Sequence, residues 1–130
     1  DVYKSHRNAL VAAVDVVVMA VPGGDDTHHL INADVLAAMR PHGLLINIAR
    51  GNVVHESALI DALQSGSIGG AGLDVYEFEP QVPEALRALD NVVLLPHLGT
   101  ASHEVRLNMW MMAVENLKAG VTGKTPPNAV

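Results

Sequence analysis

The chain has 130 residues, 49 % of them hydrophobic and 3 % aromatic, with a formal net charge of −6 and no cysteine. This length fits one domain, and an apolar fraction rich in Ala, Val, Leu and Ile favours short buried strands between helices over an aromatic-rich β-sandwich. The eight Lys and Arg residues are scattered, which excludes a basic surface for nucleic acid. No apolar run approaches the roughly 18 residues of a membrane helix, and the absence of cysteine excludes disulfides and thiolate chemistry. A cytoplasmic protein is therefore expected.

The first predicted element is a buried parallel strand over residues 15–21, a continuous apolar run that a Pro-Gly-Gly turn closes. Asn32 has a side chain suited to an N-cap, which predicts a short helix over residues 33–39. Residues 44–48 form the next predicted strand, and this strand leads directly toward Arg50.

Apolar residues at helical spacing predict a second helix over residues 56–64, and Gly66 supplies its stop signal. Residues 70–75 are typical of a third strand. A loop with two prolines then leads to a short helix over residues 84–89. A fourth strand follows over residues 92–95 and ends at a proline.

A long helix is predicted from Ser102, which acts as its cap, to about residue 119. Four strands that alternate with helices at short loop spacing predict an α/β fold with a parallel sheet. In such a sheet every strand delivers its following loop to the same edge, where ligands bind. We therefore expect four segments to gather at one edge: residues 22–27, Arg50, residues 74–79 and His97.

Side chains at neighbouring strand ends can carry chemistry. Arg50 could grip a carboxylate with two parallel hydrogen bonds, although a lone Arg is more often part of a surface ion pair. His97 can donate or accept a proton near neutral pH, or it can be an ordinary surface histidine. An acid at this edge could orient the imidazole. The alternatives are a loop turn or helix cap for Asp74 and a solvated loop acid for Glu79.

Five stretches together resemble a known family. They hold the runs Asp-Val-Val-Val-Met-Ala-Val-Pro, Thr-His-His-Leu-Ile-Asn, Leu-Leu-Ile-Asn-Ile-Ala-Arg-Gly, Gly-Leu-Asp-Val-Tyr-Glu-Phe-Glu-Pro and Asn-Val-Val-Leu-Leu-Pro-His-Leu-Gly-Thr, within residues 15–22, 27–32, 39–54, 72–80 and 91–100. In these motifs the chain resembles the D-isomer-specific 2-hydroxyacid dehydrogenases, and its sequence near Glu79 and His97 is similar to that of the glyoxylate and hydroxypyruvate reductase branch. The resemblance implies a partial Rossmann-type doubly wound parallel sheet with a long C-terminal helix.

By this resemblance, Arg50 binds the substrate carboxylate and polarises the keto oxygen, His97 exchanges a proton with that oxygen, and Glu79 pairs with His97. Asp74 faces the nicotinamide carboxamide. The implied cofactor is NAD or NADP, without a distinction between the two, and the implied lining residues are Val21, Pro22, Ile48, Ala49, Arg50, Asp74, His97, Leu98, Gly99 and Thr100. The implied substrate is a small 2-keto or 2-hydroxy acid. The intact parent is expected to be a homodimer with no nucleic-acid or membrane partner.

Two departures from the family affect what this chain can do. His55 stands where the family has Asp, which indicates an altered helix cap with no chemical role. The Gly-x-Gly-x-x-Gly turn that cradles the pyrophosphate is missing, because the glycine cluster at residues 69–72 precedes a strand instead of following one. We therefore expect residues 1–101 to be the C-terminal part of a dinucleotide-binding domain and residues 102–130 to lead back toward a substrate domain. The chain alone is expected to be inactive.

The beginning of the chain has two interpretations. Asp1-Val-Tyr resembles the end of the strand that supplies the ribose-binding acid, yet too few residues separate it from the strand at residues 15–21. Either the likeness is accidental or residues are missing near Asn8.

Other features allow further alternatives. His28 and His29 are adjacent and cannot share one face of a strand or helix, and the remaining histidines lack ligand-like spacing, so no metal site is expected. The parent could also be a phosphoglycerate dehydrogenase-like enzyme. A non-catalytic NAD-sensing protein similar to the corepressors related to this family is a third possibility.

Overall fold

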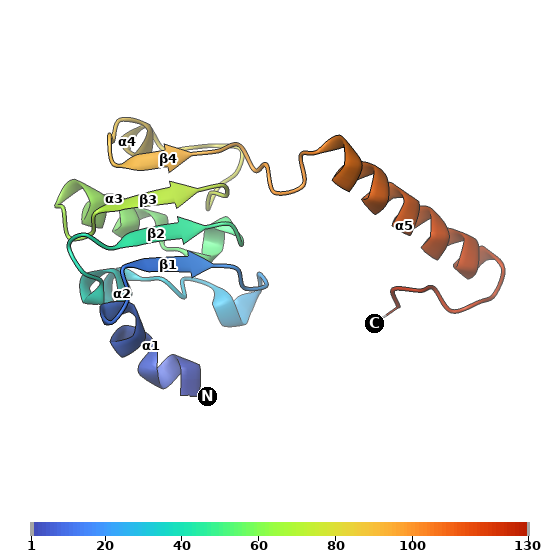
Figure 1. The fold of residues 1–130 in the computed structure, drawn as a ribbon, viewed down its shortest axis with the longest axis horizontal. Helices are drawn as coiled ribbons and strands as arrows, with labels where there is room; N and C mark the ends of the chain where they lie inside the picture. The colour runs from blue at the N-terminus through green and yellow to red at the C-terminus, as the bar shows by residue number, and fades with distance from the viewer. Residues whose placement is uncertain (1, 130) are drawn as a thin grey trace. The chain divides into compact units, whose positions relative to one another are not determined.

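A four-stranded parallel sheet forms the centre of the first part of the protein. The computed structural model describes residues 2–129, and side chains from residue 6 onward. The strands lie side by side in chain order (Figure 1): β1 (Val16–Met19), β2 (Leu44–Asn47), β3 (Gly70–Leu73) and β4 (Val92–Leu94). All four predicted strands are present. Each ends one or two residues earlier than predicted because the backbone turns away into the loop at the carboxyl edge.

Helices follow the strands as the sequence predicts. They are α2 (Ala33–Ala38), α3 (Glu56–Gln64) and α4 (Glu84–Arg87), and two short 3₁₀ helices, η1 (Asp25–Thr27) and η2 (Gly51–Val53), lie in the loops. The Asn32 side chain caps α2 by accepting a hydrogen bond from the Val35 backbone N–H at 3.1 Å. At α3, His55 Nδ1 accepts from the Ala58 backbone N–H at 3.3 Å, so the predicted altered cap is confirmed.

The first helix, α1 (Val2–Ala12), corrects one prediction. Val2 and Tyr3 are helical, so their likeness to a strand end is accidental; Asp1 lies outside the described residues. Val11 is 4 % exposed and packs in the core, which explains why this segment is a helix docked on the domain. Asn8 lies within the same helix, and the alternative of missing residues near it stays a prediction.

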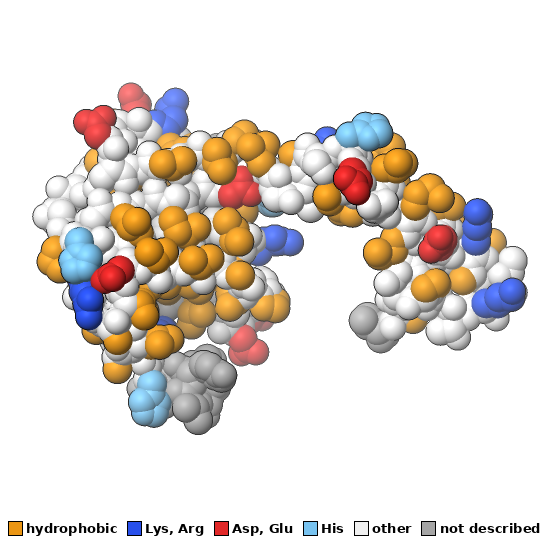
Figure 2. Space-filling view, viewed as in Figure 1, with side chains coloured by type: hydrophobic (Ala, Val, Ile, Leu, Met, Phe, Trp, Pro, Cys, Tyr) orange, Lys and Arg blue, Asp and Glu red, His pale blue; other side chains and the backbone are white. Residues whose placement is uncertain are grey.

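One face of the sheet packs against helices and the other is exposed. Figure 1 shows α2 and α3 on the covered face, and the core lies between them and the sheet. Its most buried apolar side chains, each no more than 1 % exposed, are Val35, Leu36, Leu45, Val53, Leu59, Ile68 and Leu86. Apolar side chains on the opposite face gather over the strands in Figure 2 and include Val16, Val18, Leu44 and Val93. The predicted α/β fold is thus confirmed.

A second compact unit begins at His97. Its main element is α5 (His103–Val121), two residues longer than predicted, and Ser102 caps it by accepting from the Val105 backbone N–H at 3.2 Å. None of the described side chains of α5 is buried. Among the described residues, no helix is both long and apolar enough to cross a membrane.

Candidate functional site

The carboxyl ends of β1, β2 and β3 lie along one edge of the sheet, because the three strands are parallel. Hydrogen bonds just past the strands keep their outgoing segments together: Ile48 N–H donates to Met19 O at 3.2 Å, and Asp74 N–H donates to Asn47 O at 3.0 Å. The first unit therefore brings the loops that hold Pro22, Arg50 and Asp74 to the same edge, as the sequence predicts.

The loop after β1 is closed by Thr27. Its hydroxyl is within hydrogen-bond distance of Pro22 O at 2.8 Å and Gly24 O at 3.1 Å. Gly24 has φ +147°, a backbone conformation that costs a residue with a side chain considerable strain. Val21 is half-buried and Pro22 is exposed, so this loop can offer an apolar wall and backbone groups to a ligand.

The turn after β2 is shaped by Asn47, a buried polar residue that the sequence analysis placed within a strand. Its side-chain amide donates to Arg50 O at 3.0 Å, and its side-chain oxygen accepts from Ala49 N–H at 3.1 Å. These two hydrogen bonds to the backbone fix the turn that carries Arg50. We call residues 47–51 the Arg50 turn. The one sequence signal for Asn47 was a polar residue in an otherwise apolar strand.

The Arg50 side chain is exposed at the edge. It donates through Nη1 to Ala49 O at 2.7 Å. A side chain at Gly23 would meet Arg50 Cγ at 2.9 Å, so the aliphatic part of Arg50 lies directly against the loop after β1. With only one donor group engaged in a described hydrogen bond, the guanidinium has further N–H groups to offer a carboxylate.

The loops after β2 and β3 are in close contact. A side chain at Gly51 would overlap the Tyr76 carbonyl group, so only glycine fits there. The buried Tyr76 hydroxyl donates to Leu95 O at 2.8 Å and so ties the loop after β3 to the segment just past β4. Burial raises the pKa of this hydroxyl above its usual value, and the nearby Asp74 charge raises it further. Tyr76 is therefore a neutral structural anchor at physiological pH.

Two predicted site acids lie in the loop after β3. Asp74 is 7 % exposed, directly at the end of the strand. Glu79 is exposed, and its Oε1 accepts from the Tyr76 backbone N–H at 3.0 Å, so its carboxylate braces its own loop just before the cis Glu79–Pro80 peptide bond. Asp74 is thus placed at the edge, and Glu79 has a structural role that the sequence did not reveal.

His97 is the first residue of the second unit. It is exposed and has φ +55°, in the left-handed region that histidine adopts more readily than most residues. The following residues turn back through a hydrogen bond from Ala101 N–H to Leu98 O at 2.9 Å, and this turn holds Gly99 and Thr100. Since Glu79 and His97 belong to different units, their pairing stays a prediction.

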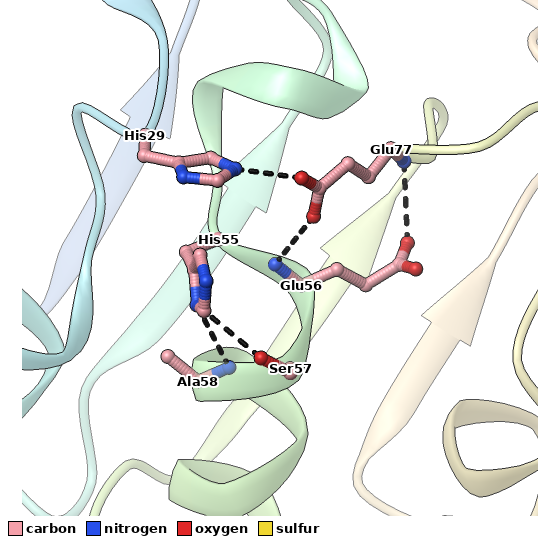
Figure 3. Close-up of polar contacts among 6 residues, drawn as sticks. All are labelled: His29, His55, Glu56, Ser57, Ala58 and Glu77. Carbon is pink, nitrogen blue, oxygen red and sulfur yellow. Dashed lines mark hydrogen bonds and ion pairs between the residues drawn. The ribbon is translucent and has the colours of Figure 1, made fainter.

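A group that the sequence analysis missed lies at the start of α3 (Figure 3). His29 Nε2 and Glu77 Oε1 are 2.6 Å apart, and Glu77 Oε2 accepts from Glu56 N–H at 3.0 Å. In return, Glu77 N–H donates to Glu56 Oε2 at 3.3 Å. We call His29, Glu56 and Glu77 the loop clamp, because they join the loops after β1 and β3 to the first turn of α3.

The two glutamates of the loop clamp have opposite pKa shifts. Burial raises the pKa of Glu56, and the Glu77 charge adds to this despite the hydrogen bond from the Glu77 backbone. Burial also pushes the pKa of Glu77 upward, but the hydrogen bonds from the Glu56 backbone and the His29 ring outweigh it and lower the pKa. Glu77 is therefore the stable anion of the pair.

Comparisons with known proteins agree on one family. Residues 1–99 match the model of the D-isomer specific 2-hydroxyacid dehydrogenase, NAD binding domain. A glyoxylate/hydroxypyruvate reductase B from Serratia proteamaculans is 49 % identical over 124 residues, which are 95 % of this chain and 38 % of that protein. A hydroxyphenylpyruvate reductase from Plectranthus scutellarioides is 50 % identical over 115 residues, 88 % of this chain and 37 % of that protein.

A solved structure shows the same likeness. It is an NADPH-dependent glyoxylate/hydroxypyruvate reductase from Sinorhizobium meliloti in complex with NADP and malonate, with a TM-score of 0.85 and 51 % sequence identity. The match covers 87 % of this chain and 35 % of that one. The chain thus spans less than two fifths of the length of each of these relatives.

Proposed function

The chain belongs to the D-isomer specific 2-hydroxyacid dehydrogenase family through its NAD-binding domain, and from this premise we propose that the whole protein is an oxidoreductase. It transfers a hydride between NAD(P)H and a small 2-keto acid such as glyoxylate or hydroxypyruvate. The names of the relatives support this reading, since the matched proteins are reductases of 2-keto acids. They favour it over a corepressor-like or phosphoglycerate dehydrogenase-like protein.

The observation that carries the proposal is the Arg50 turn. Buried Asn47 holds the turn rigidly, Gly23 leaves room for the aliphatic part of Arg50, and the guanidinium is exposed at the carboxyl edge. A permanently charged planar fork in a fixed position suits a two-point hydrogen bond to a substrate carboxylate. It also polarises a keto oxygen next to that carboxylate.

The remaining residues fit the nicotinamide end of the cofactor. Val21 and the exposed Ile48 provide apolar surface, and Asp74 provides a carboxylate that can accept from a carboxamide N–H. The bound cofactor supplies the hydride. In our proposal His97 gives a proton to the keto oxygen during reduction, Glu79 orients His97, and the segment of Leu98, Gly99 and Thr100 lines the cofactor along with Pro22 and Ala49.

The test is the Arg50→Lys variant of the whole protein, assayed for NADPH- and NADH-dependent reduction of glyoxylate and hydroxypyruvate. Lysine keeps the charge but loses the fork, so we expect kcat/KM to fall at least about tenfold, or about 1.4 kcal/mol of transition-state stabilisation. Activity equal to the unchanged protein would remove Arg50 from the site. Absence of turnover with either acid in the unchanged protein would reject the proposed substrates.

The chain by itself gives a complementary test. Its sequence has no Gly-x-Gly-x-x-Gly turn to hold a pyrophosphate, so we expect it to bind NAD weakly and to lack reductase activity. Micromolar binding of NAD to the 130-residue chain in a calorimetric titration would contradict this expectation.

Three further parts of the proposal concern the whole protein. Residues 1–101 belong to the dinucleotide-binding domain, and residues 102–130 lead toward a substrate domain. We also propose a homodimer in the cytoplasm, and the exposed apolar side chains along α5, such as Trp110 and Leu117, support association with other protein surface. Light scattering of the purified whole protein tests the dimer, and cell fractionation tests the location.

A further inference from the structure

Two adjacent histidines and a glutamate converge beside the loop clamp. The donor atoms of His28, His29 and Glu77 all lie within 4.8 Å of one another. The His28 and His29 rings are 3.8 Å apart between centroids, and their planes differ by 34°. Adjacent residues cannot share a face of a strand or helix, but these two lie in a turn, and the left-handed backbone of His29 (φ +48°) allows both rings to lie on one side.

Two imidazoles and one carboxylate are a donor set typical of first-row transition metals. Zn²⁺ binds neutral imidazole and carboxylate at about 2.0–2.2 Å, commonly with three protein ligands and one water. In the tetrahedral arrangement that Zn²⁺ prefers, two ligands about 2.1 Å from the ion lie about 3.4 Å apart. The donor atoms here lie within 4.8 Å of one another, so the wider separations have to close by at most about 1.4 Å, which rotation of the exposed His28 ring can supply. His29 Nε2 and Glu77 Oε1 have to move apart from 2.6 Å by about 0.8 Å, because the ion replaces their hydrogen bond.

The surroundings hold two of the three donors in place. The backbone N–H of His29 donates to Asn52 O at 2.8 Å, and Ile31 forms a parallel β-bridge with Val54. The backbone around His29 is therefore attached to the segment before α3. The Glu77 carboxylate is oriented by the Glu56 backbone N–H, which contacts Oε2 and leaves Oε1 directed at His29 (Figure 3). Such support from neighbouring hydrogen bonds is what an ordered metal ligand requires.

The negative charge of the site also favours a cation. Glu77 contributes a carboxylate oxygen to the site, and the buried Glu56 carboxyl group lies next to it, within 3.3 Å of the Glu77 backbone N–H. His55 is excluded as a ligand through Nδ1, because that atom caps α3. The donor set is therefore His28, His29 and Glu77, with room for water on the exposed side of His28.

We propose that His28, His29 and Glu77 bind one divalent first-row transition-metal ion, which joins the loop after β1 to the loop after β3. The site is separate from the residues assigned to hydride transfer. It does not depend on the proposed function, and its test needs no enzymatic activity.

The test is a calorimetric titration of Zn²⁺ into the 130-residue chain, purified without a histidine tag and freed of metal with a chelator. We expect saturable binding of one Zn²⁺ per chain with a Kd below about 10 μM. The His28→Ala variant should bind at least about tenfold more weakly, since even loss of an outer-shell partner typically costs 10–100-fold. Thermal unfolding should shift to higher temperature with Zn²⁺ in the unchanged protein and much less in His28→Ala.

Two further variants make the result decisive. His103→Ala removes an exposed histidine outside the site and should bind like the unchanged protein. Glu77→Gln should lose affinity as His28→Ala does; circular dichroism checks its fold. If Glu77→Gln unfolds, the affinity of His28→Ala for Zn²⁺ decides the result, because removal of the His28 ring leaves the Glu56–Glu77 hydrogen bonds in place. Unsaturable binding up to about 100 μM, or equal affinity in His28→Ala and His103→Ala, would overturn the proposal.

Discussion

The Arg50 turn and the loop clamp lie in loops of the same unit but use polar groups in opposite ways. In the Arg50 turn a buried side chain, Asn47, holds the backbone, and the charged side chain is exposed. In the loop clamp the side chains of His29, Glu56 and Glu77 make the hydrogen bonds themselves, and these bonds join residues that are 21 or 48 positions apart in the sequence. The first arrangement presents a charge to a ligand, whereas the second joins distant segments.

This difference predicts which substitutions affect activity and which affect stability. Changes at Arg50 should alter catalysis and leave the fold intact. Changes in the loop clamp should alter the free energy of unfolding and its pH dependence. Asn47 should affect both, because it is the buried support of an exposed functional group.

The largest expected effect is that of Asn47→Ala. It removes the partners of Ala49 N–H and Arg50 O, and a buried polar group left without a partner costs about 1–3 kcal/mol. We expect the free energy of unfolding, measured in urea, to fall by about 2 kcal/mol. The kcat/KM of the whole protein should fall as well, at a temperature where the variant is still folded.

Arg50→Lys is the matched control for that variant, since it should lower activity while the free energy of unfolding stays within about 0.5 kcal/mol. If Asn47→Ala destabilised the protein but kept full activity, Asn47 would support the fold without positioning Arg50.

Glu77→Gln should destabilise the folded protein by about 1.5 kcal/mol, because the hydrogen bonds to His29 and to Glu56 N–H lose their charged acceptor. The pKa of Glu77 is lowered from 4.5, so its contribution is present above that value and is lost as pH falls through the folded-state pKa. Urea unfolding at a series of pH values should therefore show the two proteins converging in acid. A constant difference across the series would mean that the Glu77 charge is not the stabilising feature.

Glu56→Gln should have a smaller effect of opposite sign. The pKa of Glu56 is raised from 4.5, so the folded state prefers the neutral acid, and ionised Glu56 costs stability at neutral pH. A neutral amide can still accept from Glu77 N–H, and we expect stabilisation of below about 1 kcal/mol at pH 7. The difference should disappear below pH 4.5, where the glutamate is itself protonated. Destabilisation at pH 7 would show that the Glu56 charge is needed in the clamp.

The smallest expected effect is at the cap of α3. His55 accepts from Ala58 N–H at a long 3.3 Å, whereas Asp is among the best N-cap residues. His55→Asp should stabilise the helix by at most about 0.5 kcal/mol, because the favourable helix dipole is partly offset by repulsion from Glu77. The thermal midpoint should rise slightly, and Ser57→Ala, next to the cap, serves as a control on the same turn.

Local features of the sequence were sufficient for most of the fold. The four strands are short apolar runs, and the caps at Asn32, His55 and Ser102 act within three residues along the chain. Arg50 and Asp74 could be assigned to one edge because parallel strands all deliver their following loops to the same side. The helix α1 was missed because no capping residue or turn signal marks its beginning within the described residues.

The tertiary structure alone decided how that edge is supported. In the sequence, Asn47 is only one more residue of a predicted strand, and its hydrogen bonds to the Arg50 turn are evident only in the structure. His29 and Glu77 are 48 positions apart, and nothing in either local sequence predicts a 2.6 Å contact. Short-range patterns determine which segments form strands and helices because those preferences depend on neighbouring residues. Contacts between loops depend on where the completed sheet places them, and for this reason the loop clamp and the neighbouring His28 ring became visible only in the folded protein.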